Sequence, residues 1–134
     1  MRSTPDLINN CIEESLRYDA PILFNWRVLR EPYEIDNVIM PVDSVIWPML
    51  ACANRDPRRF ENPDEFLIDR KGVTHQSFGG DNHFCLGNML AKVEARIAIS
   101  QFAEKTRGLS IDVGETRWSE SFFRVLGNYP IQFR

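Results

Sequence analysis

The sequence of 134 residues has few features of secreted or membrane proteins. It contains only three cysteines, Cys11, Cys52 and Cys85, and their wide, irregular spacing does not match a disulfide framework. Its longest apolar stretch, residues 45–53, contains a proline and is far too short to span a bilayer. Residues 1–6 lack the apolar core of a secretion signal. We therefore expect a cytoplasmic protein that does not enter a membrane.

The sequence also lacks a surplus of positive charge. Lysine and arginine together number 16 against 19 acidic residues, a net charge of −3 that provides no basic stripe for nucleic acid. Hydrophobic residues make up 43% and charged residues 26%, as in soluble globular proteins. The length suits one domain with its own core, so residues 1–134 are expected to form a single domain.

Two segments have apolar residues at helical spacing. They predict helices over about residues 5–18 and 86–107. The first segment begins at a proline, and Gly108 provides a C-cap for the second. These are the two main helices that the sequence predicts.

Short runs rich in β-forming residues predict small antiparallel strands. They cover residues 22–30, a hairpin of residues 33–35 and 38–40 that turns at Asp36-Asn37, residues 45–47, and several short runs after residue 108. Residues 54–72, here called the meander, are rich in turn-forming residues and predict an irregular but folded segment. The predicted fold class is α+β and mainly helical, with short antiparallel strands and this irregular meander.

Residues 78–87, here called the cysteine loop, read Phe-Gly-Gly-Asp-Asn-His-Phe-Cys-Leu-Gly. Cys85 stands about where the second helix is predicted to begin, and first-turn N–H groups favour the thiolate form that binds metals. Gly79 and Gly87 allow the backbone to approach a large flat ligand closely. Phe78 is expected to exclude water from a metal site, which tunes the metal's redox potential.

Two other interpretations of Cys85 are considered. It could be a small buried hydrophobic residue. It could also bind zinc together with His75 and His83, but the spacing fits no usual zinc pattern and a fourth ligand is missing. Cys11 and Cys52 are expected to be core or partly buried thiols.

The cysteine loop resembles the F-G-x-G-x-H-x-C-x-G loop of the cytochrome P450 family. Glu14 and Arg17 match the E-x-x-R pair of the family's K helix, about 70 residues upstream of that loop. Residues 53–57 and 63–66 are similar to the N-R-D-P and P-D-x-F segments of bacterial members. The resemblance covers essentially the whole chain. It implies the C-terminal part of the cytochrome P450 fold, from the K helix to the C-terminus.

The resemblance also implies a cofactor and an activity. Cys85 would be the axial ligand of haem b, and His83 and Arg27 would contact haem propionates, which suits N–H donors facing carboxylates. Glu14 and Arg17 would form a structural pair. A haem-thiolate monooxygenase inserts one oxygen atom into a small organic substrate with electrons from a ferredoxin-type donor, and the thiolate favours O–O cleavage.

The sequence departs from the family pattern at two places. Asp81 stands where the loop usually has its second glycine, although aspartate tolerates the left-handed backbone better than most residues. Glu65 stands where an arginine often completes the E-x-x-R network. Arg70, Arg58 or Arg59 is expected to take the place of that arginine.

The family's full chain is much longer, and its N-terminal portion supplies the oxygen-activating helix and the distal pocket. We therefore expect no catalytic residue here beyond the haem ligand, because shielding and orienting a substrate need that pocket. The alternative function is a truncated, non-catalytic module that binds haem or another protein. Apolar surface left without its usual neighbour is then expected to cause homo-oligomerisation.

Overall fold

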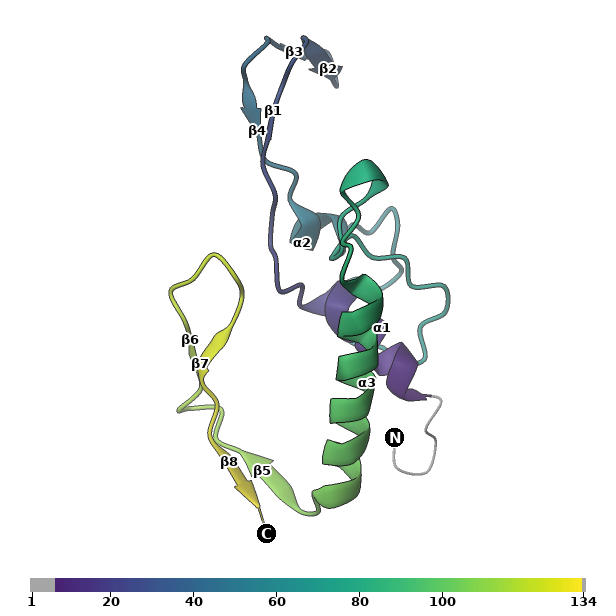
Figure 1. Cartoon of the computed structure of the whole chain (residues 1–134), viewed down its shortest axis with the longest axis vertical. Coiled ribbons are helices and arrows are strands. Elements are labelled where there is room, and N and C mark those ends of the chain that lie inside the picture. The colour runs from purple at the N-terminus through teal and green to yellow at the C-terminus, as the bar shows by residue number, and fades with distance from the viewer. Residues whose placement is uncertain (1–6, 134) are drawn as a thin grey trace.

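The computed structural model describes residues 7–133 as helices and pairs of short strands (Figure 1). The helices are α1 (Leu7–Tyr18), α2 (Leu50–Ala53), the 3-10 helix η1 (Asp81–His83) and α3 (Asn88–Lys105). The antiparallel strand pairs are β1 (Arg27–Val28) with β4 (Val45–Ile46), β2 (Tyr33–Ile35) with β3 (Val38–Met40), β5 (Leu109–Ile111) with β8 (Ile131–Phe133), and β6 (Arg117–Trp118) with β7 (Leu126–Asn128). The predicted α+β class with two main helices is confirmed.

The first helix agrees with its predicted range from Leu7 onward, and residues 5 and 6 lie outside the described part of the chain. The second helix is shorter than predicted. It begins at Asn88, because Leu86 and Gly87 form a turn, and it ends at Lys105, because Thr106 is extended with φ −100° and ψ 129°. The helix predicted over about residues 86–107 is confirmed, and its observed bounds are two residues shorter at each end.

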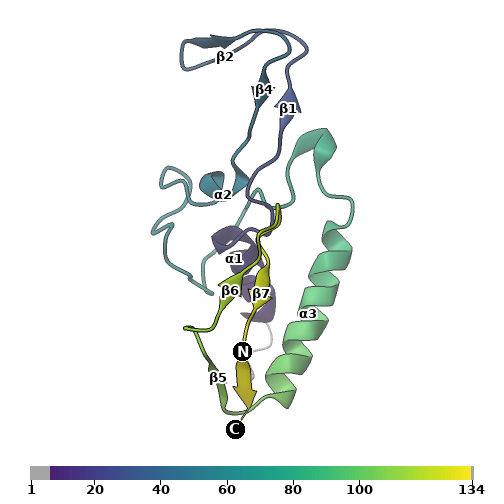
Figure 2. The same cartoon turned by 90° about the vertical axis from the view of Figure 1, so that its left-hand side faces the viewer.

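The hairpin predicted around Asp36-Asn37 is confirmed. These residues have φ of 49° and 63°, the left-handed conformation that a two-residue turn matching strand twist requires. The strand predicted over residues 22–30 is reduced to Arg27–Val28, which pairs with β4. Together, β1, β4 and the hairpin form a long arm that projects from the α1–α2 end of the molecule (Figures 1 and 2).

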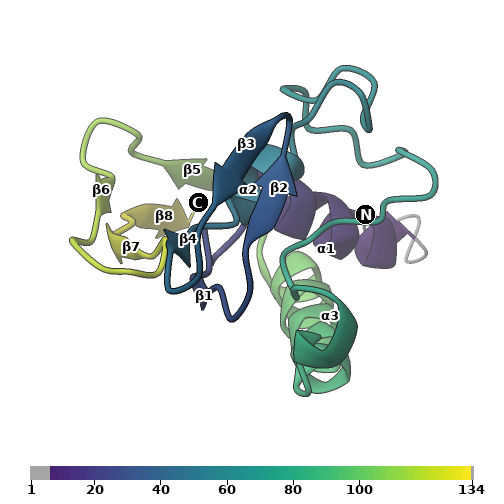
Figure 3. The same ribbon diagram turned by 90° about the horizontal axis from the view of Figure 1, so that it is seen from above.

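The core lies around α1 and the meander. The buried hydrophobic residues are Ile8, Ile12, Ala20, Leu50 and Phe60. The largest fully buried side chains are polar, namely Arg17, Glu14 and Asn54. No residue of α3 is buried, although α3 packs against α1. From above, α3, the β2–β3 hairpin and the C-terminal strands extend in different directions from α1 (Figure 3).

The meander is confirmed as irregular. Residues 54–80 contain turns and bends but no helix or strand, and they run from the end of α2 to η1. A segment without its own backbone ladder needs other partners for its polar groups. Two buried side chains of α1 are in position to contribute them.

Candidate functional site

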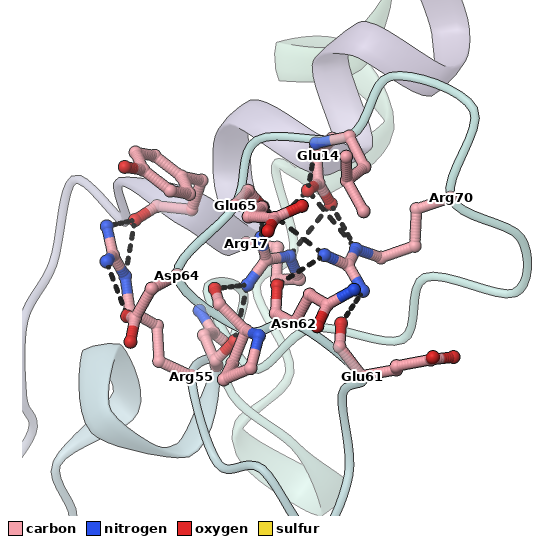
Figure 4. Close-up of polar contacts among 12 residues, drawn as sticks. Glu14, Arg17, Arg55, Glu61, Asn62, Asp64, Glu65 and Arg70 are labelled. Atoms are coloured by element: carbon pink, nitrogen blue, oxygen red, sulfur yellow. Dashed lines mark hydrogen bonds and ion pairs between the residues drawn. The ribbon is translucent and has the colours of Figure 1, made fainter.

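Glu14 and Arg17 form a buried, bidentate ion pair on α1 (Figure 4). Arg17 Nε donates a hydrogen bond to Glu14 Oε2 at 2.8 Å, and Arg17 Nη2 donates to Glu14 Oε1 at 2.7 Å. The pair forms because residues three apart lie on the same face of a helix. Two parallel bonds of this kind fix the orientation of both side chains.

The remaining donors of Arg17 hold the meander. Arg17 Nη1 donates to the carbonyl oxygens of Asn54 at 3.1 Å and Pro63 at 2.7 Å, and Nη2 donates to that of Glu65 at 2.8 Å. With the two bonds to Glu14, these contacts match the five N–H donors of a guanidinium group. A single buried side chain therefore supplies hydrogen bonds to three carbonyl groups of the segment.

Arg70 completes this network, and the expectation for it is confirmed. Its Nε lies 3.2 Å from both carboxylate oxygens of Glu14, and its Nη1 donates to the carbonyl of Glu61 at 2.5 Å (Figure 4). Arg58 and Arg59 are exposed instead. Glu65 takes part only through its carbonyl group.

The carboxylate of Glu14 also accepts the backbone N–H of Leu67 at 2.9 Å. Burial alone would raise the pKa of Glu14. The hydrogen bonds from Arg17, Leu67 and Arg70 outweigh burial, so the pKa of Glu14 lies below its usual value. Glu14 is therefore held as a carboxylate at neutral pH.

Asn54 and Ser77 connect this network to the cysteine loop, and the sequence analysis missed both. Asn54 Nδ2 donates to Ser77 Oγ at 2.8 Å, and Ser77 Oγ donates to the carbonyl of Leu16 at 2.5 Å. Asn54 Oδ1 accepts the N–H of Gln76 at 2.6 Å. The only signal in the sequence was that Asn54 begins the N-R-D-P-like segment.

The cysteine loop is closed by one backbone hydrogen bond, from the N–H of Cys85 to the carbonyl of Phe78 at 2.8 Å. Gly79 has φ of 73°, and a Cβ there would lie 3.3 Å from the carbonyl oxygen of His83. Asp81 has φ of 50°, so this aspartate adopts the left-handed backbone expected of the glycine it replaces.

Cys85 is exposed and lies three residues before the first residue of α3, close to where the helix is predicted to begin. The carbonyl of Cys85 accepts the side-chain Nδ2 of Asn88 at 2.7 Å and its backbone N–H at 3.3 Å. These bonds fix the turn between the thiol and the helix. The exposure of Cys85 also excludes its interpretation as a buried hydrophobic residue.

Gly87 leaves the space beside the sulfur open. Its φ of −82° is ordinary for any residue, so its backbone does not require glycine. A Cβ at this position would have one neighbour within 4 Å, the Sγ of Cys85 at 4.0 Å. The absence of a side chain therefore matters for what can approach the sulfur.

A cavity of about 310 Å³ lies next to Cys85. Five of its lining residues come from the cysteine loop and the residue before it, namely Ser77, Phe78, Gly79, His83 and Cys85. The others are Leu16, Pro21, Ile22, Asn25 and Leu50. The structure thus brings His83 and Cys85 together at one cavity.

Arg27 is not among the residues that line this cavity. It lies on β1, opposite Ile46 of β4, and its Nη1 donates to the carbonyl of Trp26 at 2.8 Å. Its predicted contact with a propionate stays a prediction.

No group of three His, Cys, Asp or Glu side chains that could hold a metal ion occurs within residues 7–133. This finding contradicts a zinc site at His75, His83 and Cys85. One thiol beside an open cavity instead fits a metal that brings its own equatorial ligands, as haem iron does. Of the other thiols, Cys11 is partly buried as expected, but Cys52 is exposed on α2, so its expected burial is wrong.

Comparison with known proteins gives consistent results. The family model described as Cytochrome P450 matches residues 2–106. The chain is 40% identical over 134 residues to the biotin biosynthesis cytochrome P450 of Bacillus subtilis, covering 99% of this chain and 34% of the relative. It is 36% identical over 138 residues to the cytochrome P450 monooxygenase PikC of Streptomyces venezuelae, covering 100% of this chain and 33% of PikC.

A solved structure gives the same result for the fold. The crystal structure of P450BioI in complex with an acyl carrier protein ligated to hexadec-9Z-enoic acid matches with a TM-score of 0.94 and 40% identity, covering 99% of this chain and 35% of that chain. The chain therefore spans about a third of the length of the relatives it matches. Within the described residues, we find no helix with the length and apolar character needed to cross a bilayer.

Proposed function

The chain belongs to the cytochrome P450 family, and from this premise we propose that it binds haem b through the thiolate of Cys85 as part of a haem-thiolate monooxygenase. The observation that carries this proposal is the cavity of about 310 Å³ that Cys85 and His83 line together. Haem held by a cysteine thiolate supplies the oxygen chemistry by which such an enzyme inserts one oxygen atom into an organic substrate.

The residues around the sulfur each have a proposed role. Cys85 provides the single protein ligand to iron, and Gly87 leaves room for a flat ring beside it. Phe78 and Phe84 lie edge to face with ring centroids 6.3 Å apart, and this aromatic pair limits the access of water to the ligand.

The proposed propionate contacts are His83 and Arg27. His83 is supported by its place in the lining of the same cavity as Cys85. Arg27 is supported by its match to the family position, and its guanidinium would exchange the carbonyl of Trp26 for a propionate. Carboxylate partners favour such donors.

We assign the chain to the C-terminal part of the family fold. We assign the distal pocket to the two-thirds of the relatives' length that this chain does not cover. The small organic substrate and a ferredoxin-type electron donor belong to that complete enzyme. Within this chain, the haem ligand is the only residue that we assign to catalysis. We place the protein in the cytoplasm, where a reducing environment keeps its three free thiols unpaired.

The test is the spectrum of the chain reconstituted with haem, reduced, and exposed to carbon monoxide. The wild type should show the red-shifted Soret band of thiolate ligation, and Cys85→Ala should lose it. Cys52→Ala is the matched control, because Cys52 is also an exposed thiol, and it should keep the band. A wild-type protein that binds haem without this band would contradict the proposal.

A second candidate function is a non-catalytic module that self-associates. The observation that favours it is the apolar surface of α3, where no residue is buried. The large side chains exposed along this helix are Met89, Leu90, Val93, Ile97 and Phe102. Apolar patches of this kind mark interaction surfaces. Sedimentation should show a dimer or larger species that Ile97→Glu weakens, and a wild-type monomer at micromolar concentration would contradict this candidate.

A further inference from the structure

His75 lies between α1 and α3, just before the cysteine loop. Its side chain is only 3% exposed. Its Nδ1 accepts the backbone N–H of Ser77 at 3.2 Å. Its Nε2 is buried and has no hydrogen-bond partner among residues 7–133.

Two charged groups face this imidazole, one from each helix packed against it. Glu13 Oε2 on α1 lies 3.4 Å from His75 Nε2. Lys92 Nζ on α3 lies 2.8 Å from Glu13 Oε1. Phe78, the first residue of the cysteine loop, contacts both, because its ring centroid is 5.6 Å from that of His75 and 5.5 Å from Lys92 Nζ.

We propose that neutral His75 is a positioning residue that holds the start of the cysteine loop against α1 and α3, and that its protonation releases this hold. In the neutral form, Nδ1 accepts from Ser77 and the proton is on Nε2. In the protonated form both ring nitrogens carry a hydrogen, so Nδ1–H faces the N–H of Ser77 and their hydrogen bond is lost. At Ser77, protonation therefore replaces an attractive contact with two opposed donors, while the attraction between Nε2–H and Glu13 on α1 grows and opposes the change.

Burial and the charges around His75 set the pH at which the imidazole is protonated and the hydrogen bond to Ser77 is lost. Burial lowers the pKa of His75 and Lys92 lowers it further, while Glu13 raises it, and the net result lies below the usual value of 6.5. When the pKa of a group is lower in the folded state than in the unfolded state, the group makes its full contribution to stability at a pH above the unfolded-state pKa. That contribution is lost as the pH falls from about 6.5 through the lowered pKa.

The release is transmitted along the chain to Cys85. Ser77 precedes Phe78, and the carbonyl of Phe78 accepts the N–H of Cys85 at 2.8 Å. Ser77 Oγ keeps its bonds to Asn54 and Leu16, so the loop loosens without detaching. The consequence for haem rests on the proposed function, whereas the ordering of the loop does not.

The first test is amide hydrogen exchange at Ser77, measured by NMR on the full chain between pH 8 and pH 5 and corrected for intrinsic rates. Loss of one hydrogen bond should lower the protection factor of Ser77 roughly tenfold as His75 titrates. His75→Asn keeps an acceptor near the position of Nδ1 but does not titrate. In this variant the protection factor of Ser77 should not vary with pH. His75→Phe keeps the bulk without an acceptor and should have low protection throughout. Protection that is constant in the wild type would overturn the proposal.

The second test moves the midpoint of the transition. Lys92→Met removes a cation and should move the midpoint to higher pH, whereas Glu13→Gln removes the anion and should move it to lower pH. If both variants keep the wild-type midpoint, the transition comes from a group other than His75, and that result would also overturn the proposal.

The rate of haem release from the reconstituted chain provides a separate measurement. It should rise with the same midpoint as the loss of Ser77 protection, and the midpoint should shift in the same direction in each charge variant. If the chain takes up no haem while Ser77 titrates as described, the proposed function fails and the positioning role of His75 stands. If haem binds through Cys85 but the protection of Ser77 does not respond to pH, the proposed function stands and the positioning role of His75 fails.

Discussion

Arg70 Nε lies 3.2 Å from both carboxylate oxygens of Glu14, although the two residues are 56 positions apart in the chain. Arg17, on the same helix as Glu14, holds the same oxygens. One carboxylate is therefore shared by a local arginine and a distant one. This sharing makes Glu14 the point at which α1 and the meander are joined.

Arg17→Met should be strongly destabilising, because it leaves the carboxylate of Glu14 buried with fewer partners and removes hydrogen bonds from three carbonyl groups. Removing one member of a buried ion pair costs about 3–5 kcal/mol. Urea unfolding followed by circular dichroism measures the change. Arg58→Met is the control, since Arg58 pairs with Asp56 on the surface, and it should leave the urea midpoint nearly unchanged. Equal effects of the two substitutions would contradict a structural role for Arg17.

The lowered pKa of Glu14 predicts a loss of stability in acid. A carboxyl group with a folded pKa below its unfolded value stabilises the fold fully above about pH 4.5, and this contribution is lost as the pH falls through the lowered pKa. Melting temperatures measured from pH 7 to pH 3 should therefore fall more steeply for the wild type than for Glu14→Gln. Glu14→Gln should also be less stable at pH 7. Parallel curves for the two proteins would show that Glu14 does not titrate as described.

Asp81→Gly should stabilise the chain. Aspartate with φ of 50° carries a left-handed penalty of about 1–2 kcal/mol, and glycine removes it at a cost of about 0.5–1 kcal/mol in unfolded-state entropy. The expected net gain in urea unfolding is between about 0 and 1.5 kcal/mol, toward the lower end because aspartate tolerates this backbone better than most residues. Asn82→Gly is the control, because Asn82 does not have positive φ, and it should lower stability. A destabilised Asp81→Gly variant would mean that the aspartate side chain contributes more than its backbone costs.

Gly87→Val should separate folding from haem binding. The ordinary φ of Gly87 and the open space around it predict a normal melting temperature, while the new side chain lies beside the sulfur of Cys85. Haem titration should show affinity weakened by roughly 5- to 150-fold, as expected from the roughly 1–3 kcal/mol cost of overpacking a site. Gly79→Ala, in contrast, should lower the melting temperature. Gly79 has φ of 73°, and a Cβ there would lie 3.3 Å from the carbonyl oxygen of His83. Unchanged haem affinity in Gly87→Val would argue against a ring beside this position.

The parts of the fold that the sequence predicted depend on local interactions. The turn at Asp36-Asn37 requires only that two residues accept positive φ, and the hairpin follows from it. The Glu14–Arg17 pair needs only helical spacing. The start of α3 lies two residues after its predicted position, because Leu86 and Gly87 form the turn that ends the loop around Cys85.

The parts that the sequence did not predict depend on contacts between distant segments. The bond from Asn54 to Ser77 joins residues 23 positions apart, and neither residue type indicates it. Arg27 matched a family position, but the location of its side chain depends on how β1 leaves α1. Burial of His75 likewise follows from the packing of α1 against α3, which periodicity in either helix does not specify.

Arg17 and Arg70 hold the irregular segment through main-chain oxygen atoms. The acceptors are the carbonyl groups of Asn54, Glu61, Asn62, Pro63 and Glu65. Every amino acid carries such a carbonyl, so these hydrogen bonds do not depend on which side chains stand at the five positions. Asn54 is the exception, because its buried side chain also bonds Ser77 and Gln76. The other four positions can accept substitutions in evolution while the segment keeps its path, whereas neither arginine can be exchanged without losing these bonds.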